Sequence, residues 1–377
     1  MEHVHIALVG GQTYPVYLAI KALKPTKVVL MHSKQTETDA NAIINVLVEE
    51  RTLSKEQIEK VCLSTTDMGE ISDKMIDQEV LIPENAQCTL NLSGGTKLWS
   101  ILLYKIFQHH LDTDFYYVDQ NCKLYNIETL QQHDVDIQLD TKTIFKLYGS
   151  PVKSYTAFEE YTQEDLNVIK KVEKLRSFNF DAYNNVGNPN KKAEVNKINS
   201  QKTGVIYSGD SYAEWNKEEH SVEVCFYNRK GIHRSDTLES PHAVQLFFFC
   251  HWFELKVAKV LSSWEHAKQV WLNVEFPYRN NNPKNEIDIV VNTGKRLLFV
   301  ECKTQIKDKT NIDKFSKAVK NYSGMASKAL FVSFAPLEEI TREKCAQNDV
   351  LCFDLSRQSE NDLFEMLNQS LNELNKK

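Results

Sequence analysis

The first 140 residues alternate between short apolar runs and longer segments whose apolar positions recur every three to four residues. The apolar runs have the length and β-branched content of buried strands, and the longer segments have the period of helices packed on one face. The expected strands lie at 3–9, 27–32, 88–92, 114–117 and 123–127. The expected helices lie at 16–23, 39–50 and 97–109. This alternation predicts a parallel sheet covered by helices on both faces, so residues 1–140 are expected to form a Rossmann-like α/β domain.

The pattern weakens and charge increases from about residue 141, and we expect a linker at 141–163 followed by a second α/β domain at 164–377. Residues 184–204 are rich in Asn, Lys and Gly and lack an apolar period, which predicts an exposed loop or flap. The expected helices of this domain lie at 164–175, 243–262, 312–321, 337–347 and 360–374. The expected strands lie at 204–207, 221–227, 269–276, 285–290, 298–303, 329–334 and 350–354.

A chain of 377 residues is long enough for two or three domains. Its net charge of −6 argues against a surface that binds polyanions everywhere, so any contact with nucleic acid must be local. A run of seven lysines offers such a contact, although it equally suits the solvated face of a helix. These are Lys303, Lys307, Lys309, Lys314, Lys317, Lys320 and Lys328.

The eight cysteines are scattered and include no Cys-x-x-Cys pair, so we expect them to be reduced and structural. The N-terminus enters a strand without the basic and apolar regions of a signal peptide, and the longest apolar stretch, around 243–253, is too short to span a bilayer. The protein is therefore expected to be cytoplasmic, with no membrane contact.

Two apolar runs near residue 290 carry candidate catalytic groups. They are joined by a Gly-containing turn, which predicts a hairpin. Side chains alternate along a strand, so Glu301 and Lys303 project to the same side, and Asp288 on the preceding strand can lie beside them. Glu-x-Lys is a common surface pattern, but this one follows a buried-strand run, where an unpaired carboxylate is costly. Two carboxylates and one ammonium suit a metal-dependent phosphodiesterase, with Mg²⁺ or Mn²⁺ held by Asp288, Glu301 and the backbone carbonyl of Cys302.

Two glycine loops follow expected strands of the first domain, at the sheet edge where open α/β sheets place ligands. Glycines let backbone amides approach a phosphate, so these loops predict a phosphate or nucleotide pocket. Neither loop matches the dinucleotide fingerprint or the P-loop, and a single Gly-Gly pair is usually only a turn. The first loop contains Gly10, Gly11, Gln12 and Thr13, and the second segment contains Asn91, Ser93, Gly94, Gly95, Thr96 and Lys97.

Taken together, these motifs resemble two known families. The order Glu254, Asp288, Glu301-x-Lys303, extended by Gln305, resembles the PD-(D/E)xK restriction-endonuclease superfamily. The sequence departs from that pattern because Pro283 is five positions before Asp288 and because the gap after Glu254 is long. The N-terminal part, with its early Gly-Gly turn and its Asn-Leu-Ser-Gly-Gly-Thr-Lys segment, is similar to CARF domains.

The pair of domains resembles the effector nucleases of type III CRISPR systems that cyclic oligoadenylates activate. The resemblance implies an N-terminal Rossmann-like CARF domain, a C-terminal restriction-endonuclease-like domain and a homodimer around a cyclic oligoadenylate, with cyclic tetra-adenylate expected and a ring of six adenylates as the alternative. It implies cleavage of single-stranded DNA, single-stranded RNA or both, with nicking of duplex DNA as an extension. Glu254 would hold a second metal ion or a water, Lys303 would activate the attacking water, and Gln305 would complete the catalytic set.

Two other functions fit parts of the pattern. A ligand-controlled DNA-binding transcription regulator would share the sensor domain, but it would need a basic recognition helix and would leave Asp288 and Glu301 without a role. A scaffolding module with a degenerate nuclease fold would bind nucleic acid without cutting it. Cleavage assays with and without metal and activator separate these alternatives.

Overall fold

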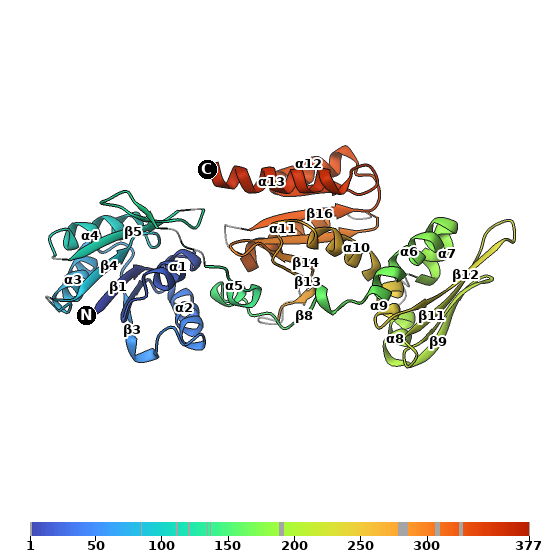
Figure 1. Ribbon diagram of the computed structural model, residues 1–377, viewed down its shortest axis with the longest axis horizontal. Coiled ribbons are helices and arrows are strands. Elements are labelled where there is room, and N and C mark those ends of the chain that lie inside the picture. Colours follow the sequence, from blue (N-terminus) through green and yellow to red (C-terminus); the bar gives the residue numbers. More distant parts are fainter. Residues whose placement is uncertain are drawn as a thin grey trace.

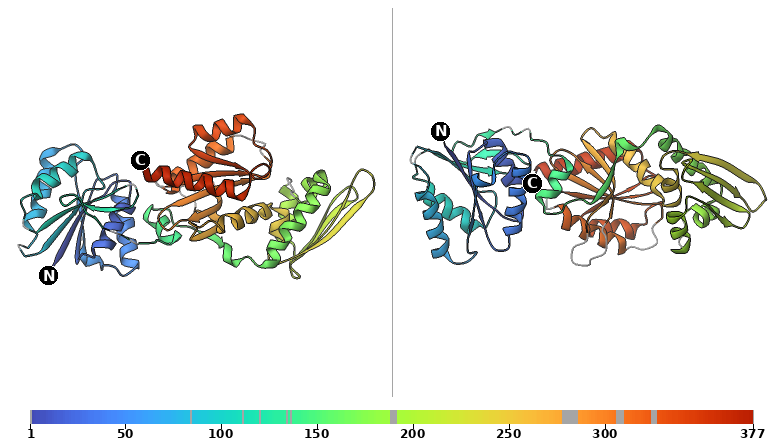
Figure 2. Two further views of the ribbon diagram at one scale, coloured as in Figure 1. Left: turned by 45° about the horizontal axis from the view of Figure 1, so that its top comes forward. Right: turned by 90° about the horizontal axis from the view of Figure 1, so that it is seen from below.

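The computed structural model describes residues 2–83, 85–110, 112–119, 121–133, 135, 137–187, 192–277, 286–305, 310–323 and 327–376. The molecule is elongated, and its three sheets follow one another along the long axis (Figure 1). A seven-stranded sheet lies at the N-terminal end, a six-stranded sheet lies in the middle, and a four-stranded sheet lies at the far end. Two further views show the same succession (Figure 2).

The N-terminal sheet has the order β3-β2-β1-β4-β5-β6-β7, with β1 to β5 parallel and the last two strands antiparallel. Its strands are β1 (His3–Leu8), β2 (Lys27–His32), β3 (Ile58–Cys62), β4 (Gln87–Asn91), β5 (Thr113–Val118), β6 (Leu124–Asn126) and β7 (Gln132–His133). Its helices are α1 (Tyr14–Leu23), α2 (Glu37–Glu49), η1 (Lys55–Gln57), α3 (Met68–Val80) and α4 (Lys97–Phe107). Along β1, Ala7 packs in the core that contains α1 and α2, whereas Ile6 and Leu8 pack in the core that contains α3 and α4. This two-faced packing confirms the Rossmann-like architecture.

The central sheet has the order β17-β16-β15-β14-β13-β8, parallel from β15 to β17 and antiparallel elsewhere. Its strands are β8 (Ser154–Ala157), β13 (Gln269–Glu275), β14 (Glu286–Asn292), β15 (Leu297–Lys303), β16 (Lys328–Ser333) and β17 (Val350–Asp354). Its helices are α10 (His251–Ser262), α11 (Thr310–Ser323), α12 (Glu339–Gln347) and α13 (Glu360–Lys376). Helices α10 and α13 contribute to the core on one face, and α11 and α12 contribute to the core on the other.

A helical and antiparallel unit is inserted between β8 and β13. It contains η2 (Phe158–Glu160), α6 (Gln163–Phe178), α7 (Phe180–Ala182), η3 (Tyr183–Gly187), α8 (Lys192–Ser200), β9 (Thr203–Ser208), β10 (Ser211–Asn216), β11 (Ser221–Tyr227), β12 (His233–Glu239) and α9 (Ala243–Phe248). The prediction of a loop at 184–204 is wrong over most of its described part, because η3 and α8 are helices there. Residues 188–191 lie outside the described residues. Helix α8 has a single buried residue, Ile198, so its polar sequence shows no apolar period.

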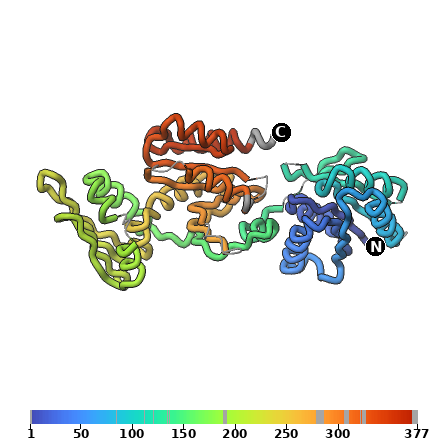
Figure 3. Tube along the Cα trace, turned by 180° about the vertical axis from the view of Figure 1, so that it is seen from behind, coloured from blue at the N-terminus to red at the C-terminus, as the bar shows by residue number. Residues whose placement is uncertain are grey.

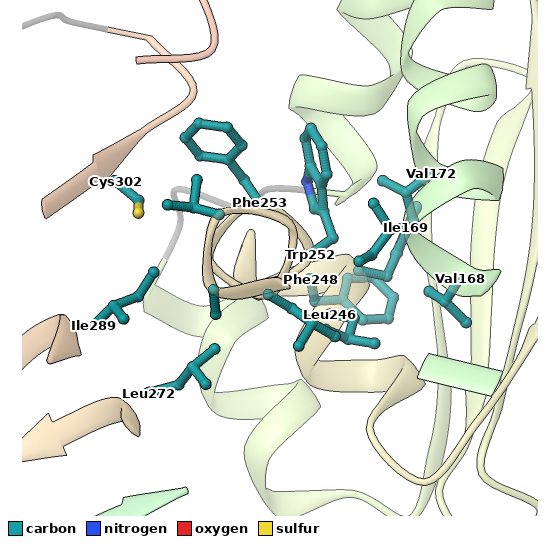
Figure 4. Close-up of a cluster of buried hydrophobic side chains, with 14 of the residues drawn as sticks. Val168, Ile169, Val172, Leu246, Phe248, Trp252, Phe253, Leu272, Ile289 and Cys302 are labelled. Carbon is teal, nitrogen blue, oxygen red and sulfur yellow. The ribbon is translucent and has the colours of Figure 1, made fainter. Parts of the chain in front are cut away.

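The prediction of a single helix at 243–262 is also wrong. It is two helices, α9 and α10, separated at Cys250, whose φ of 62° is left-handed. A left-handed residue ends the run of helical hydrogen bonds, so α10 starts in a new direction. Figure 4 shows α10 between Leu272, Ile289 and Cys302 on the central sheet and Val168, Ile169 and Val172 on α6. Helix α10 therefore joins the inserted unit to the central sheet.

The segment expected to be a linker contains helix α5 (Thr141–Leu147) and strand β8, which pairs with β13. Figure 3 shows this segment between the N-terminal and central sheets. The Phe145 ring lies 5.1 Å from the Phe276 ring and 5.9 Å from the Phe299 ring, edge to face. One hydrophobic cluster includes α1, α2, α5 and a face of the central sheet. The two domains thus share a continuous core around α5.

Candidate active site

The hairpin β14–β15 brings the predicted acids together. Ile289 pairs with Val300 in the antiparallel ladder, and Asp288 and Glu301 each lie one residue beyond this pair. Cross-strand neighbours in an antiparallel pair project to the same face, which places the two carboxylates side by side. Side chains alternate between the two faces along a strand, so Lys303, two residues after Glu301, projects to that face as well.

The three head groups converge on one another. The Lys303 Nζ atom lies 2.5 Å from Glu301 Oε1 and 3.4 Å from Asp288 Oδ2. Asp288 Oδ2 also accepts a hydrogen bond of 2.7 Å from the backbone N–H of Cys302. The side chains of Asp288 and Glu301 are 16% and 15% exposed, so the cluster is largely screened from solvent but still accessible.

Glu254 approaches the same cluster from α10, one turn after the helix begins. Its Oε2 atom is buried and has no hydrogen-bond partner among the residues that the structure describes. Burial, reinforced by the neighbouring Asp288, raises the pKa of Glu254 well above its usual value. A buried carboxyl oxygen without a partner costs about 1–3 kcal/mol, so its retention here requires a compensating ligand or a proton.

The electrostatics of the cluster reflect an excess of acids. Burial, followed by the Asp288 charge, raises the pKa of Glu301 from 4.5 to about 7. Burial opposes the charge of Lys303, but Asp288 and Glu301 outweigh it and hold the pKa of this ammonium above its ordinary value. Three carboxylates face one ammonium, so full ionisation would leave a charge that one divalent cation balances.

Oxygen donors are the ligands that Mg²⁺ and Mn²⁺ prefer, and the partnerless oxygen of Glu254 fits such an ion. The described side chains are nonetheless not preassembled, because no group of three His, Cys, Asp or Glu residues among them could already hold a metal. The Lys303 ammonium instead contacts both Asp288 and Glu301. A cation would have to draw these carboxylates away from the lysine.

Cys302 and Gln305 differ from the other predicted residues. The Cys302 side chain lies in the hydrophobic core, and burial raises the pKa of its thiol well above the usual value, so only its main chain can take part (Figure 4). Gln305 lies in the bend just beyond β15, and no hydrogen bond joins it to another described residue.

Lys314, Lys317 and Lys320 are exposed on α11, whereas Lys307 and Lys309 lie outside the described residues. Lys328 is paired with Asp349 at 3.3 Å.

His251, three residues before Glu254 on α10, was not among the residues predicted from the sequence. Burial lowers the pKa of this imidazole, and the Asp288 charge acts in the opposite direction. Residues three apart share a helix face, so the His-x-x-Glu spacing was the available signal. His251 is thus a neutral proton donor and acceptor within electrostatic range of the acids.

The two glycine loops of the N-terminal domain also meet. They follow β1 and β4, which are adjacent strands. A Cβ atom on Gly94 would lie 2.0 Å from the Leu8 carbonyl oxygen, and a Cβ atom on Gly10 would lie 3.0 Å from the Gly95 backbone nitrogen. The loops are therefore packed backbone to backbone, a fit that only residues without side chains allow.

The remaining residues of these loops divide into exposed and structural groups. Gly11 and Lys97 are exposed, Gln12 is half-buried, and Lys97 begins α4 without an ion pair to any described residue. Thr13 is fully buried, and Thr96 caps α4 by accepting a bond from the Trp99 N–H. Asn91 accepts hydrogen bonds from the backbone and hydroxyl of Ser93, and Ser93 accepts one from Val118 N–H. Asn91 and Ser93 therefore support the loop, whereas the buried Thr13 hydroxyl has no hydrogen-bond partner among the described residues. Gly11 and Lys97 face the outside.

The helices within the described ranges include none with the length and apolar character needed to cross a bilayer.

A search of curated proteins found no match. Family models match two parts of the chain. The Card1 CARF domain matches residues 4–144, and the Card1-like endonuclease domain matches residues 242–360.

Three solved structures share the fold at low sequence identity. Can2 from Sulfobacillus thermosulfidooxidans, in complex with cyclic tetra-adenylate, is 16% identical with a TM-score of 0.69, covering 98% of this chain and 99% of that one. Protein VC1899 from Vibrio cholerae is 14% identical with a TM-score of 0.73, covering 99% and 98%. A type III CRISPR defence DNA nuclease activated by cyclic oligoadenylate is 15% identical with a TM-score of 0.56, covering 94% of this chain and 50% of that one.

The order of the two matched domains agrees with the order of the sheets, and the second match contains all four residues of the converging cluster. The chain therefore joins a CARF domain of the Card1 type to an endonuclease domain of the Card1 type.

Proposed function

We propose that this protein is a divalent-metal-dependent endonuclease of type III CRISPR defence that cyclic tetra-adenylate switches on. The observation that carries the proposal is the convergence of Asp288, Glu301 and Lys303 beside the partnerless buried oxygen of Glu254. Single-stranded DNA and RNA are the proposed substrates, with nicking of duplex DNA as an extension. The exposed lysines of α11 offer the phosphate backbone a local basic surface.

Asp288, Glu301 and the main-chain carbonyl of Cys302 would hold Mg²⁺ or Mn²⁺, with Glu254 as a further oxygen donor. The bound ion would supply Lewis-acid chemistry at the phosphodiester. Lys303, released from the two carboxylates, would orient the attacking water and stabilise the negative charge of the transition state. Gln305, just beyond β15, would position the substrate phosphate. His251 would accept or donate a proton, since burial keeps its imidazole neutral.

The sensor would bind the activator over the paired glycine loops. Backbone amides around Gly10, Gly11, Gly94 and Gly95 and the exposed ammonium of Lys97 offer phosphate contacts. We propose that two copies of the chain close around the ring, because a self-symmetric ligand suits a two-fold interface. Cyclic tetra-adenylate must bind the active arrangement more tightly than the inactive one in order to switch it.

The test is cleavage of end-labelled single-stranded DNA and RNA by purified protein, with and without cyclic tetra-adenylate and with Mg²⁺, Mn²⁺ or EDTA. Cleavage should require both activator and metal in the unmodified protein. Glu301→Ala and Lys303→Ala should each reduce the rate by at least about 10²-fold. Retained cleavage by either variant would refute the assigned cluster.

Glu218→Gln is the matched control, because the Glu218 side chain is 66% exposed and forms a surface ion pair with Lys202. This control should cleave at the unmodified rate. For the sensor, Lys97→Ala should raise the activator concentration needed for half-maximal cleavage while leaving the maximal rate unchanged. An unchanged activator response would remove Lys97 from the sensing site.

A further inference from the structure

A polar pocket lies where the sensor meets the turn of the β14–β15 hairpin. Its volume is about 470 Å³, within the range of sites for small molecules. Four parts of the chain line it: the β5–β6 turn of the sensor, the loop between α10 and β13, the β14–β15 turn, and helix α13. The C-terminal end of α13 reaches toward the N-terminal domain (Figures 1 and 2).

Basic groups outnumber acids among the described residues of the lining. Lys123, Lys295, Arg296 and His266 line the pocket together with Glu265. Arg296 is only 9% exposed, so its guanidinium lies deep in the pocket, where Nη2 donates to Asn121 Oδ1 at 3.3 Å.

The other charges divide between paired and unpaired groups. Glu265 already contacts His266 at 3.5 Å, and the Asp119 carboxylate of the sensor accepts bonds from the backbone N–H groups of Asn121 and Lys123. Lys123 and Lys295 form no ion pair within the described part of the chain. The Asp119 charge acts on the Arg296 guanidinium, so the exposed ammonium groups of Lys123 and Lys295 are what leave the site positive, and a small anion would neutralise them.

The non-charged lining suits a ligand larger than a bare anion. Asn368 provides its amide N–H groups and Leu371 an apolar surface. The Asn368 Oδ1 atom already accepts from Trp264 Nε1 at 2.8 Å, and the Thr293 hydroxyl is hydrogen-bonded to the Arg296 main chain. A sugar and a base present complementary groups, whereas inorganic phosphate would leave most of this lining without contact.

We infer that this pocket binds a nucleoside monophosphate, with its phosphate held by Lys123, Lys295 and Arg296. The site lies at the opposite end of β14 and β15 from the Asp288 and Glu301 carboxylates, since Thr293 and Arg296 form the hairpin turn. It is also distinct from the glycine loops, which follow β1 and β4. Binding here requires neither the nuclease chemistry nor the cyclic activator, so its test stands apart from that of the proposed function.

The β14–β15 turn, which contributes to the pocket, is hydrogen-bonded to the sensor. Asn292 donates to the Leu139 carbonyl at 2.7 Å, and the Leu139 N–H donates to the Gly294 carbonyl at 3.1 Å. A ligand that joins Lys123 of the sensor to Lys295 of the hairpin would therefore bridge both sides of an existing contact.

The experiment is isothermal titration of the full-length protein with adenosine 5′-monophosphate and, separately, with inorganic phosphate. Adenosine 5′-monophosphate should bind more tightly than phosphate. The Lys123→Ala/Lys295→Ala double variant should bind it at least about tenfold more weakly, because a hydrogen bond to a charged group contributes at least that factor. Both lysines are exposed, so the double variant should keep the melting temperature of the unmodified protein.

Lys230→Ala is the matched control, since Lys230 is an exposed lysine in the turn between β11 and β12. Lys97→Ala reports binding at the glycine loops, and both single variants should keep the unmodified affinity. Equal affinity for phosphate and nucleotide, unchanged binding by the double variant, or a loss confined to Lys97→Ala would each overturn the inference. Absence of binding at millimolar nucleotide would overturn it as well.

Discussion

Replacing Glu301 by glutamine should abolish cleavage and yet stabilise the metal-free protein at alkaline pH. The Glu301 side chain is only 15% exposed, and burial with the Asp288 charge raises its pKa from 4.5 to about 7. The folded state therefore binds more protons than the unfolded state between these two values, so the free energy of unfolding falls as pH rises through this window. Glutamine does not titrate, so the free energy of unfolding of the variant does not fall with pH for this reason.

The magnitude follows from the pKa. One pKa unit corresponds to about 1.4 kcal/mol, so a pKa displaced from 4.5 to about 7 costs the unmodified protein about 3 kcal/mol by pH 8. The pKa of about 7 already includes the favourable Lys303 contact. Glutamine resembles the protonated acid, so Glu301→Gln should match the unmodified protein near pH 4.5 and be the more stable protein at pH 8 by about 3 kcal/mol.

The assay is urea denaturation followed by circular dichroism at several pH values between 4.5 and 8, in EDTA. A second series with Mg²⁺ should stabilise the unmodified protein at pH 8 and leave the variant nearly unchanged. Glu218→Gln, at an exposed ion pair, should follow the unmodified protein throughout. Parallel pH profiles for the unmodified protein and Glu301→Gln would refute the account of a strained, charge-rich cluster.

Two further predictions concern backbone packing and the buried carboxylate of Asp165. Gly94→Ala should lose activator binding in titrations and at least about 2 kcal/mol of stability in melting assays, because its Cβ would lie 2.0 Å from the Leu8 carbonyl oxygen. Gly11→Ala, with open space around it, should keep the melting temperature of the unmodified protein. Burial alone would raise the pKa of Asp165, but bonds from Thr162 and His242 lower it. Asp165→Asn should therefore cost about 1–3 kcal/mol at pH 7 in urea denaturation, and the difference should shrink as pH falls below about 4.

The parts of the site that local patterns encode were predictable. Asp288, Glu301 and Lys303 lie on two strands joined by a short turn, so period-two alternation and a hairpin were enough to bring them together. The glycine loops followed from their places after β1 and β4, since ends of neighbouring parallel strands share one edge. Both predictions needed no knowledge of distant contacts.

Other features depend on conformations or partners that a local pattern does not encode. Cys250 adopts a left-handed conformation that is rare for a residue with a side chain, so the break between α9 and α10 was not visible. Strand β8 is short and pairs with β13 more than a hundred residues later, so its segment looked like a linker. Helix α8 buries only Ile198 and carried no apolar period.

The core around α5 restricts how this protein can be divided. Phe145 packs against Phe276 and Phe299 of the central sheet, while Lys146 forms an ion pair with Glu49 of α2. A fragment cut at residue 140 would leave apolar surface of α1 and α2 uncovered, and the complementary fragment would lose the sensor side of the same cluster. The sensor and the nuclease domain are therefore not interchangeable modules. A chimaera that joins this sensor to another effector domain must keep α5 together with the face of the central sheet that α5 packs against.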